Sequence, residues 1–175
     1  QTEWADMRAA YDALDRDVRL RIRDLKARHS LYHSQGEIGE GDSTTAQGLR
    51  TLHANDGNAQ SAQTDGYRAP ETGVAPLRPL VKVHPVTGRP ALFIGRHAFG
   101  IEGYGGAESE QLLRELVDFA CRPPRIYSHE WRVGDLVMWD NRCVLHRARP
   151  WKLDEPRVML HTRVNGNPAT ELAAG

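Results

Sequence analysis

The second half of the chain contains short stretches of β-forming residues that follow one another without helices between them. These stretches are Arg125–Val133, Asp135–Trp139 and Val158–Val164, and they are separated by Gly-Asp and Pro signals. β-Branched and aromatic residues favour strands, whereas parallel strands need a long, usually helical, crossover between them. We therefore predict a mostly β, antiparallel fold with flanking helices.

Two further elements are expected before these stretches. Leu80–His84 and Ala91–Ile94 flank a Pro- and Gly-containing turn, which predicts a hairpin. Glu108–Cys121 has the apolar spacing of an amphipathic helix, and the pair Pro123-Pro124 ends it. The residues of the apolar stripe are Leu112, Leu113, Leu116, Val117 and Ala120.

The opening third has helical character. Met7–Leu14 is rich in Ala and Leu, and Asp15 precedes a segment with Val18, Ile22 and Leu25 at helical spacing. From Gln35 to Pro79 the chain is rich in Gly, Ser, Thr, Asn and Gln and has few apolar residues. Such a segment does not bury enough surface to offset its ordering entropy, so we expect a long polar loop that acts as a lid over a pocket.

Charge and length limit the class of partner. The 175 residues include 23 Lys plus Arg and 23 Asp plus Glu, so no net positive charge attracts nucleic acid or a membrane surface. No apolar run approaches the roughly 20 residues that span a bilayer. One cytoplasmic domain that acts on a small molecule is the expectation, and a homo-oligomer is left open. Cys121 and Cys143 lack the paired spacing of a zinc or disulfide framework, which leaves imidazole and carboxylate as metal ligands.

The stretch from Trp131 to His146 carries the strongest functional signal. A Gly-Asp turn leads into an apolar strand, the strand ends in Asp140-Asn141-Arg142, and His146 follows. This order can place an imidazole at the mouth of a barrel, where ligand sites commonly lie. A lone histidine is more often structural than a metal ligand, so the pattern by itself leaves both readings open.

This stretch resembles the signature of the taurine dioxygenase and 2,4-dichlorophenoxyacetate dioxygenase (TauD/TfdA) family. Two further segments, Thr2–Leu14 and His84–Arg89, are similar to family segments in the same order. The resemblance covers nearly the whole chain except Gln35–Pro79 and implies the C-terminal portion, residues 1–175, of one oxygenase domain. The implied fold is a double-stranded β-helix, or jelly roll, of which this chain holds only a part.

The resemblance also implies the site. His146 corresponds to the last ligand of a two-His, one-carboxylate Fe(II) centre. Arg157 lies eleven residues later and corresponds to the residue that binds the distal carboxylate of 2-oxoglutarate, helped by the Thr2 hydroxyl. Such a centre leaves three positions open, two for the 2-oxo acid and one for dioxygen. An Arg fork suits a carboxylate because it makes two parallel charged hydrogen bonds.

The chain departs from the family pattern at the other iron ligands. In the family a His-x-Asp or His-x-Glu pair precedes the Thr2 segment, and none of the eight histidines here has an acidic residue two positions on. We expect the missing ligands in an N-terminal portion that this sequence does not contain. The chain by itself is expected to be inactive.

A second departure concerns the substrate. The family's substrate-binding Arg, fifteen residues after the ligand His, is replaced by His161. Strand alternation puts His161 and Arg163 on the same face as Arg157, and both are pocket candidates together with His84 and, less strongly, His97. The implied reaction is hydroxylation of a small phenoxyacetate-, sulfonate- or sulfate-ester-like substrate beside a heteroatom.

Two other functions are left open. One is a non-catalytic jelly-roll module that keeps a ligand pocket without the missing iron ligands. The other is a zinc hydrolase built from His129, His146 and His161, although no His-Glu-x-x-His spacing supports it.

Overall fold

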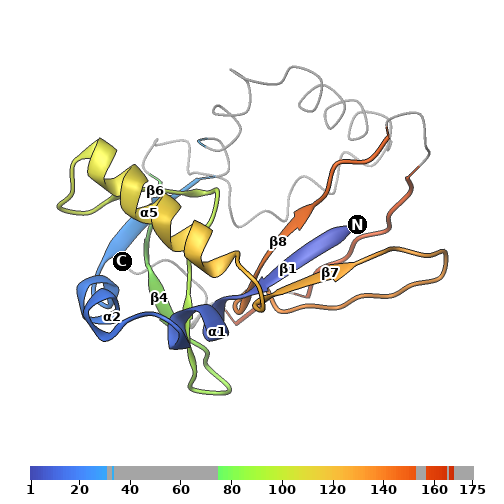
Figure 1. Cartoon of the computed structure of the whole chain (residues 1–175), viewed down its shortest axis with the longest axis horizontal. Coiled ribbons are helices and arrows are strands. Elements are labelled where there is room, and N and C mark those ends of the chain that lie inside the picture. The colour runs from blue at the N-terminus through green and yellow to red at the C-terminus, as the bar shows by residue number, and fades with distance from the viewer. Residues whose placement is uncertain (31–32, 34–74, 153–156, 165, 168–175) are drawn as a thin grey trace.

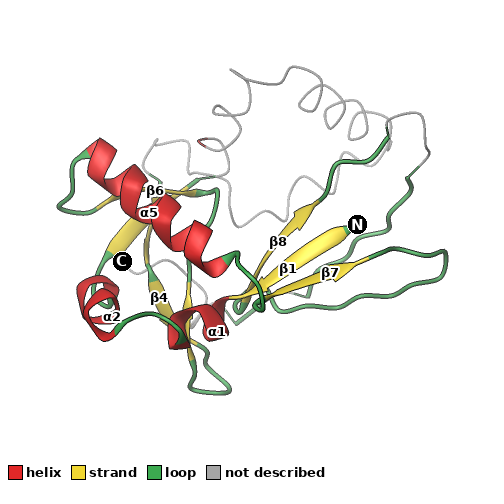
Figure 2. Ribbon diagram, in the orientation of Figure 1, coloured by secondary structure: helices red, strands yellow, loops and turns green. Residues whose placement is uncertain are grey.

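The computed structural model describes residues 1–30, 33, 75–152, 157–164 and 166–167 (Figures 1 and 2). The elements in chain order are β1 (Thr2–Asp6), α1 (Met7–Asp12), α2 (Arg16–Ile22), β2 (Lys26–His29), β3 (Leu77–Pro79), β4 (Val81–Val83), β5 (Pro90–Leu92), β6 (Ala98–Ile101), α5 (Gly106–Ala120), β7 (Ile126–His129) and β8 (Val144–Ala148). Within these ranges, no helix is both long and apolar enough to cross a bilayer.

The strands form three small sheets in which every pairing is antiparallel. One sheet has the order β7-β1-β8, the second β3-β2-β6, and the third is the hairpin β4-β5. Figure 1 shows β7, β1 and β8 side by side, extending away from the helices. The predicted mostly β class with flanking helices is confirmed, as are the hairpin and the third helix.

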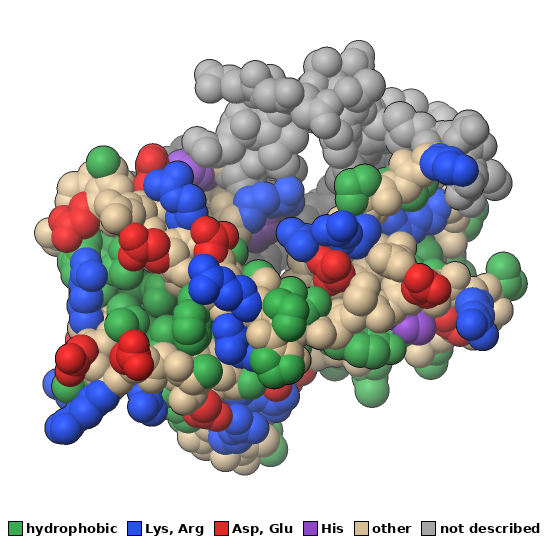
Figure 3. Space-filling view, in the orientation of Figure 1, with side chains coloured by type: hydrophobic (Ala, Val, Ile, Leu, Met, Phe, Trp, Pro, Cys, Tyr) green, Lys and Arg blue, Asp and Glu red, His purple; other side chains and the backbone are tan. Residues whose placement is uncertain are grey.

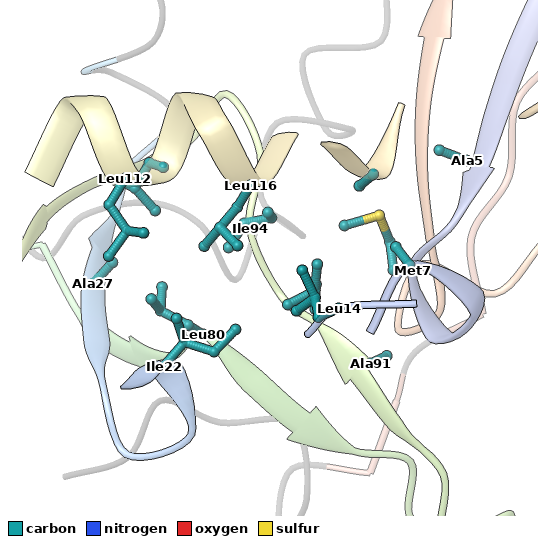
Figure 4. Packing of buried hydrophobic residues seen from close by; sticks show 14 of the residues in the cluster. Ala5, Met7, Leu14, Ile22, Ala27, Leu80, Ala91, Ile94, Leu112 and Leu116 are labelled. Carbon is teal, nitrogen blue, oxygen red and sulfur yellow. The ribbon is translucent and has the colours of Figure 1, made fainter. Parts of the chain in front are cut away.

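Helix α5 packs its apolar stripe over the β3-β2-β6 sheet and the residues that flank the β4-β5 hairpin. Leu112 and Leu116 face Ala27 of β2 and Leu80 and Ile94 near the hairpin (Figure 4), and all five residues are buried. Each leucine buried in this way stabilises the fold by roughly 2 kcal/mol. The cluster continues through Met7, Ala10, Leu14 and Ile22, so α1 and α2 are held to the same core as α5.

The first strand corrects the expectation for the opening residues. Although the opening third was expected to be helical, Thr2 lies in β1, which pairs with β7 on one side and β8 on the other. Helix α1 begins only at Met7, where the Asp6 carboxylate accepts the backbone N–H of Arg8 and Ala9. Likewise Leu25 lies after the end of α2, and the chain turns there into β2.

Two predicted β-rich runs are not strands. Asp135–Trp139 and Val158–Val164 are irregular because no described strand pairs with their backbones. The polar segment also ends earlier than predicted: Ala75 and Arg78 are buried, and β3 pairs with β2. The lid prediction for residues 35–74 falls outside the described residues.

The visible face in Figure 3 carries Lys or Arg and Asp or Glu side chains interspersed over the described elements. This distribution agrees with the equal numbers of basic and acidic residues in the sequence.

Candidate functional site

The central strand β1 brings the candidate residues of both chain ends onto one face of a sheet. In its pairing with β8, Thr2 lies opposite Ala148 and Trp4 lies opposite His146. Because strand side chains alternate between faces and directly paired residues share one, Thr2, Trp4 and His146 lie on the same face. The opposite face holds Glu3, whose carboxylate is 2.7 Å from Arg147 Nε.

Thr2 and Arg157, predicted to hold the same carboxylate, are neighbours. The buried Thr2 hydroxyl oxygen accepts hydrogen bonds from Trp131 Nε1 at 2.8 Å and from Arg157 Nη2 at 3.5 Å. Both contacts use the oxygen as acceptor, which leaves the hydroxyl proton available for an anionic acceptor. The Arg157 guanidinium lies over the ring of Trp151 at 4.8 Å from its centroid, a cation–π contact that orients the fork.

His146 is exposed as a residue, but its ring lies against that of Trp139, with 5.1 Å between centroids. Partial burial lowers the pKa of His146, and the nearby positive charges of His161 and Arg163 lower it further. No described residue forms a hydrogen bond with this imidazole. The lowered pKa favours the neutral imidazole, which is the form that binds a metal ion.

The pocket candidates gather around His146. His161 stacks on Trp139 with 6.2 Å between ring centroids. Arg163 and His161 are both close enough to act on the pKa of His146. Burial lowers the pKa of His97, and Arg96 and His146 add to this effect. His161, Arg163 and His97 thus all lie close enough to His146 for their charges to interact with it.

Tryptophan side chains, which were not among the predicted site residues, complete this side. Trp4 lies 5.3 Å from Trp139 and 6.5 Å from Trp131, measured between ring centroids. Trp131 supports the Thr2 hydroxyl, and Trp151 supports Arg157. The available signal was that three of the four tryptophans lie within or directly after the Trp131–His146 stretch.

His84 has a different setting. Its Nε2 lies 3.1 Å from an Asp140 carboxylate oxygen, and its Nδ1 accepts the backbone N–H of Val86 and Thr87. Both ring nitrogens are therefore engaged within the protein, and a substrate contact would have to break one of these bonds. The proposed pocket role of His84 stays a prediction.

One group in the described ranges has metal-ligand atoms close together: His84, Asp140 and Cys143, all within 4.8 Å. Burial and the Asp140 charge raise the pKa of the Cys143 thiol, which keeps it protonated. The Asp140 carboxylate already accepts the side-chain N–H groups of Arg142. Because His84 and Asp140 are already hydrogen-bonded within the protein and the thiol is protonated, this group does not fit a metal ion.

The zinc alternative is not assembled either. His129 donates or accepts through Nε2 with Asp135 at 2.9 Å, and its Nδ1 lies 3.2 Å from the Tyr127 hydroxyl. Among the described residues no metal-ligand group joins His129 with His146 and His161.

The described part of the site fits an iron centre that takes one ligand from this chain. His146 offers a neutral imidazole nitrogen, and the Thr2 and Arg157 donors stand on the same side of the sheet. No described carboxylate joins His146 in a ligand group. The described residues thus present one imidazole suited to a metal ion and, separately, a pair of donors suited to a carboxylate.

Comparison with known proteins gives the family of the chain. Residues 1–163 match the model of the family described as "Taurine catabolism dioxygenase TauD, TfdA family". The chain is 51% identical over 173 residues to an (S)-phenoxypropionate/alpha-ketoglutarate-dioxygenase of Sphingobium herbicidovorans, covering 99% of the chain and 55% of that protein. It is 40% identical over 159 residues to an alpha-ketoglutarate-dependent 2,4-dichlorophenoxyacetate dioxygenase of Cupriavidus pinatubonensis, covering 90% and 47%.

Among solved structures, AAD-2 in complex with Mn(II) and N-oxalylglycine superposes with a TM-score of 0.68 at 36% identity, covering 89% of this chain and 52% of that one. The chain thus spans about half the length of the relatives it matches. The family match, the sequence identity and the fold agree, and the chain belongs to the TauD/TfdA family.

Proposed function

We propose that this chain forms the cosubstrate-binding and one-histidine part of an Fe(II)- and 2-oxoglutarate-dependent dioxygenase. Its substrate would be a small organic anion, hydroxylated on a carbon beside a heteroatom. Relatives at 51% and 40% identity carry names that state alpha-ketoglutarate dependence, which supports the cosubstrate.

The observation that carries the proposal is the contact between Thr2 and Arg157. These residues stand 155 positions apart in sequence, yet Arg157 Nη2 lies 3.5 Å from the Thr2 hydroxyl. A guanidinium fork beside a free hydroxyl donor is suited to one carboxylate, which would accept from both. Thr2 also shares its face of the sheet with His146, so a bound dicarboxylate can extend toward the metal ligand.

The residues of this chain would divide the work as follows. Arg157 and Thr2 bind the distal carboxylate, Trp131 and Trp151 hold these two side chains in place, and His146 supplies one metal ligand. When bound, Fe(II) would supply the activation of dioxygen that couples decarboxylation of 2-oxoglutarate to hydroxylation. AAD-2 was solved with Mn(II) and N-oxalylglycine, which stand in for Fe(II) and 2-oxoglutarate.

For the substrate we propose an aryloxyalkanoic acid. Relatives named for (S)-phenoxypropionate and 2,4-dichlorophenoxyacetate are 51% and 40% identical, whereas a sulfate ester dioxygenase of Pseudomonas putida is 28% identical. His161 and Arg163 lie beside His146 and provide positive charge or donors for a carboxylate. Hydroxylation beside the ether oxygen gives a hemiacetal-type product, whose C–O bond to the aryl ether oxygen breaks to leave a phenol and a 2-oxo acid.

The test is His146→Ala in the protein expressed from its complete reading frame. We expect loss of tight Fe(II) binding and of substrate-dependent 2-oxoglutarate consumption, because an ill-formed site remains when one of three protein ligands is removed. His129→Gln is the control and should keep iron binding, since His129 contacts Asp135 instead. Unchanged iron stoichiometry in His146→Ala refutes the assignment.

The same measurements distinguish a dioxygenase from the non-catalytic binding module. A wild-type protein that binds iron and 2-oxoglutarate, but consumes no 2-oxoglutarate with any aryloxyalkanoate, sulfonate or sulfate ester, would support a binding module. The sequence relationship to named dioxygenases favours turnover.

A further inference from the structure

The turn of the β4-β5 hairpin contacts the turn that precedes β8. His84 follows β4 directly, is 8% exposed, and its Nε2 lies 3.1 Å from Asp140 Oδ2. Arg142 donates to the same carboxylate through its backbone N–H at 2.9 Å and through Nη2 at 2.7 Å. One carboxylate therefore joins two segments that lie 56 residues apart in sequence.

The hydrogen bonds define the tautomer of His84. Val86 and Thr87 donate their backbone N–H groups to Nδ1 at 3.2 and 3.1 Å. A nitrogen that accepts cannot carry a proton, so the proton of the neutral ring is on Nε2 and is donated to Asp140. The two ring nitrogens thus contact different turns: Nδ1 accepts from the hairpin turn, and Nε2 donates to Asp140 in the turn before β8.

The neighbouring turn leads directly to the iron-ligand candidate. Cys143 donates its backbone N–H to the Asp140 carbonyl at 3.0 Å, and its own carbonyl accepts from Met7 at 2.9 Å. Strand β8 begins at the next residue and reaches His146 two positions later. Trp139, which packs on the His146 ring, immediately precedes Asp140. Asp140 therefore lies between Trp139, which packs on His146, and strand β8, which carries His146.

We propose that His84 and Asp140 are positioning residues: their hydrogen bond fixes the start of β8 and thereby the place of the His146 imidazole. This proposal rests on the proposed function, because it takes His146 as the iron ligand. It gives His84 a role other than the substrate contact predicted from sequence. A ligand held by a rigid turn keeps its geometry without the metal, and a loosened turn weakens metal binding.

The experiment compares His84→Asn, Asp140→Asn and the double variant in the protein from the complete reading frame. Asn places an oxygen near the position of His Nδ1, so it can still close the hairpin turn but is too short to reach Asp140. We expect each single variant to bind Mn(II), used as the probe, about tenfold more weakly. The double variant should bind Mn(II) no more weakly than the weaker single variant, since His84→Asn removes and Asp140→Asn weakens the same contact.

A second readout does not depend on the metal. Amide hydrogen exchange of residues 141–146 in the metal-free protein should be faster in His84→Asn and Asp140→Asn than in the wild type. Arg89→Gln is the matched control: it breaks the contact of the same hairpin with Asp12 of α1, at 2.6 Å, without touching Asp140. It should leave both Mn(II) affinity and the exchange of residues 141–146 unchanged.

The outcomes are distinct. Unchanged exchange and Mn(II) affinity in His84→Asn overturn the proposal, and a rise in substrate KM alone would return His84 to the pocket role. Additive losses in the double variant also overturn it, because the two residues would then act separately. If His146→Ala binds iron normally, the proposed function fails, while the exchange experiment still decides whether His84 and Asp140 hold β8. Should Asp140→Asn fail to fold, His84→Asn carries the test by itself.

Discussion

Replacing His29 should change how the stability of this protein depends on pH. His29 lies in β2, is 6% exposed and stacks on Phe93 with 5.2 Å between ring centroids. Its Nε2 is buried, and no described residue forms a hydrogen bond with it. Burial, with the positive charges of Arg78, His97 and Lys82, lowers the pKa of His29 from 6.5 to about 4. The folded protein thus binds this proton less readily than the unfolded chain does.

The sign and size follow from linkage. Well above pH 6.5 the imidazole is neutral in both the folded and the unfolded state, so its protonation does not change the free energy of unfolding. As the pH falls below 6.5, His29 becomes protonated in the unfolded chain but stays neutral in the folded protein down to about pH 4. The free energy of unfolding therefore decreases across this window. A lowering from 6.5 to about 4 corresponds to a total loss of about 3 kcal/mol.

The assay is urea unfolding followed by tryptophan fluorescence at several pH values. Between about pH 7.5 and about pH 4.5 the wild type should lose roughly 2 to 3 kcal/mol that His29→Phe keeps, since Phe fills the site and takes no proton. Near neutral pH the variant should be at least as stable, because it removes a buried nitrogen without a partner. His29→Leu is the second non-titrating variant and should show the same flattened dependence. Parallel curves for wild type and both variants would refute the reasoning.

Four further changes test other parts of the structure. Arg157→Gln should raise the KM for 2-oxoglutarate by a factor that corresponds to roughly 2 to 5 kcal/mol of lost binding free energy. A KM within about threefold of the wild-type value would show that Arg157 does not bind the cosubstrate. Leu116→Ala, in the buried stripe of α5, should lower the free energy of unfolding by about 2 to 5 kcal/mol, which urea titration measures. Asp6→Ala removes the cap of α1 and should cost about 1 kcal/mol in the same titration, whereas Asp6→Asn should cost less. Gly95→Ala should cost about 1 to 3 kcal/mol, because φ is +147° and the added Cβ would lie 2.8 Å from Leu145 Cδ2; a thermal midpoint equal to that of wild type would contradict this.

Local pattern was sufficient for the elements whose side chains define them. Glu108–Cys121 was recognisable as a helix because its stripe of leucines recurs at the helical period, and the structure has α5 at Gly106–Ala120. The β4-β5 hairpin was recognisable because its turn contains Pro and Gly between two β-forming runs. In both cases the information lies within about fifteen neighbouring residues.

The run Asp135–Trp139 shows the limit of such patterns. Its composition favours a strand, yet it is irregular in the part of the chain that the structure describes. A strand needs a second backbone to accept and donate its hydrogen bonds, and composition does not say whether that backbone is present. The converse holds for Thr2–Asp6, which precedes a helical segment in the sequence and forms the central strand of a sheet.

The sequence by itself determined the family signature and the order of the candidate residues His146 and Arg157 along the chain. The family resemblance implied that Thr2 and Arg157 bind the same carboxylate, but only the tertiary structure gave their direct contact and showed that His84 meets Asp140. These contacts join residues 155 and 56 positions apart. Side chains that far apart meet only when packing and strand register close the intervening chain, and no local pattern records that closure.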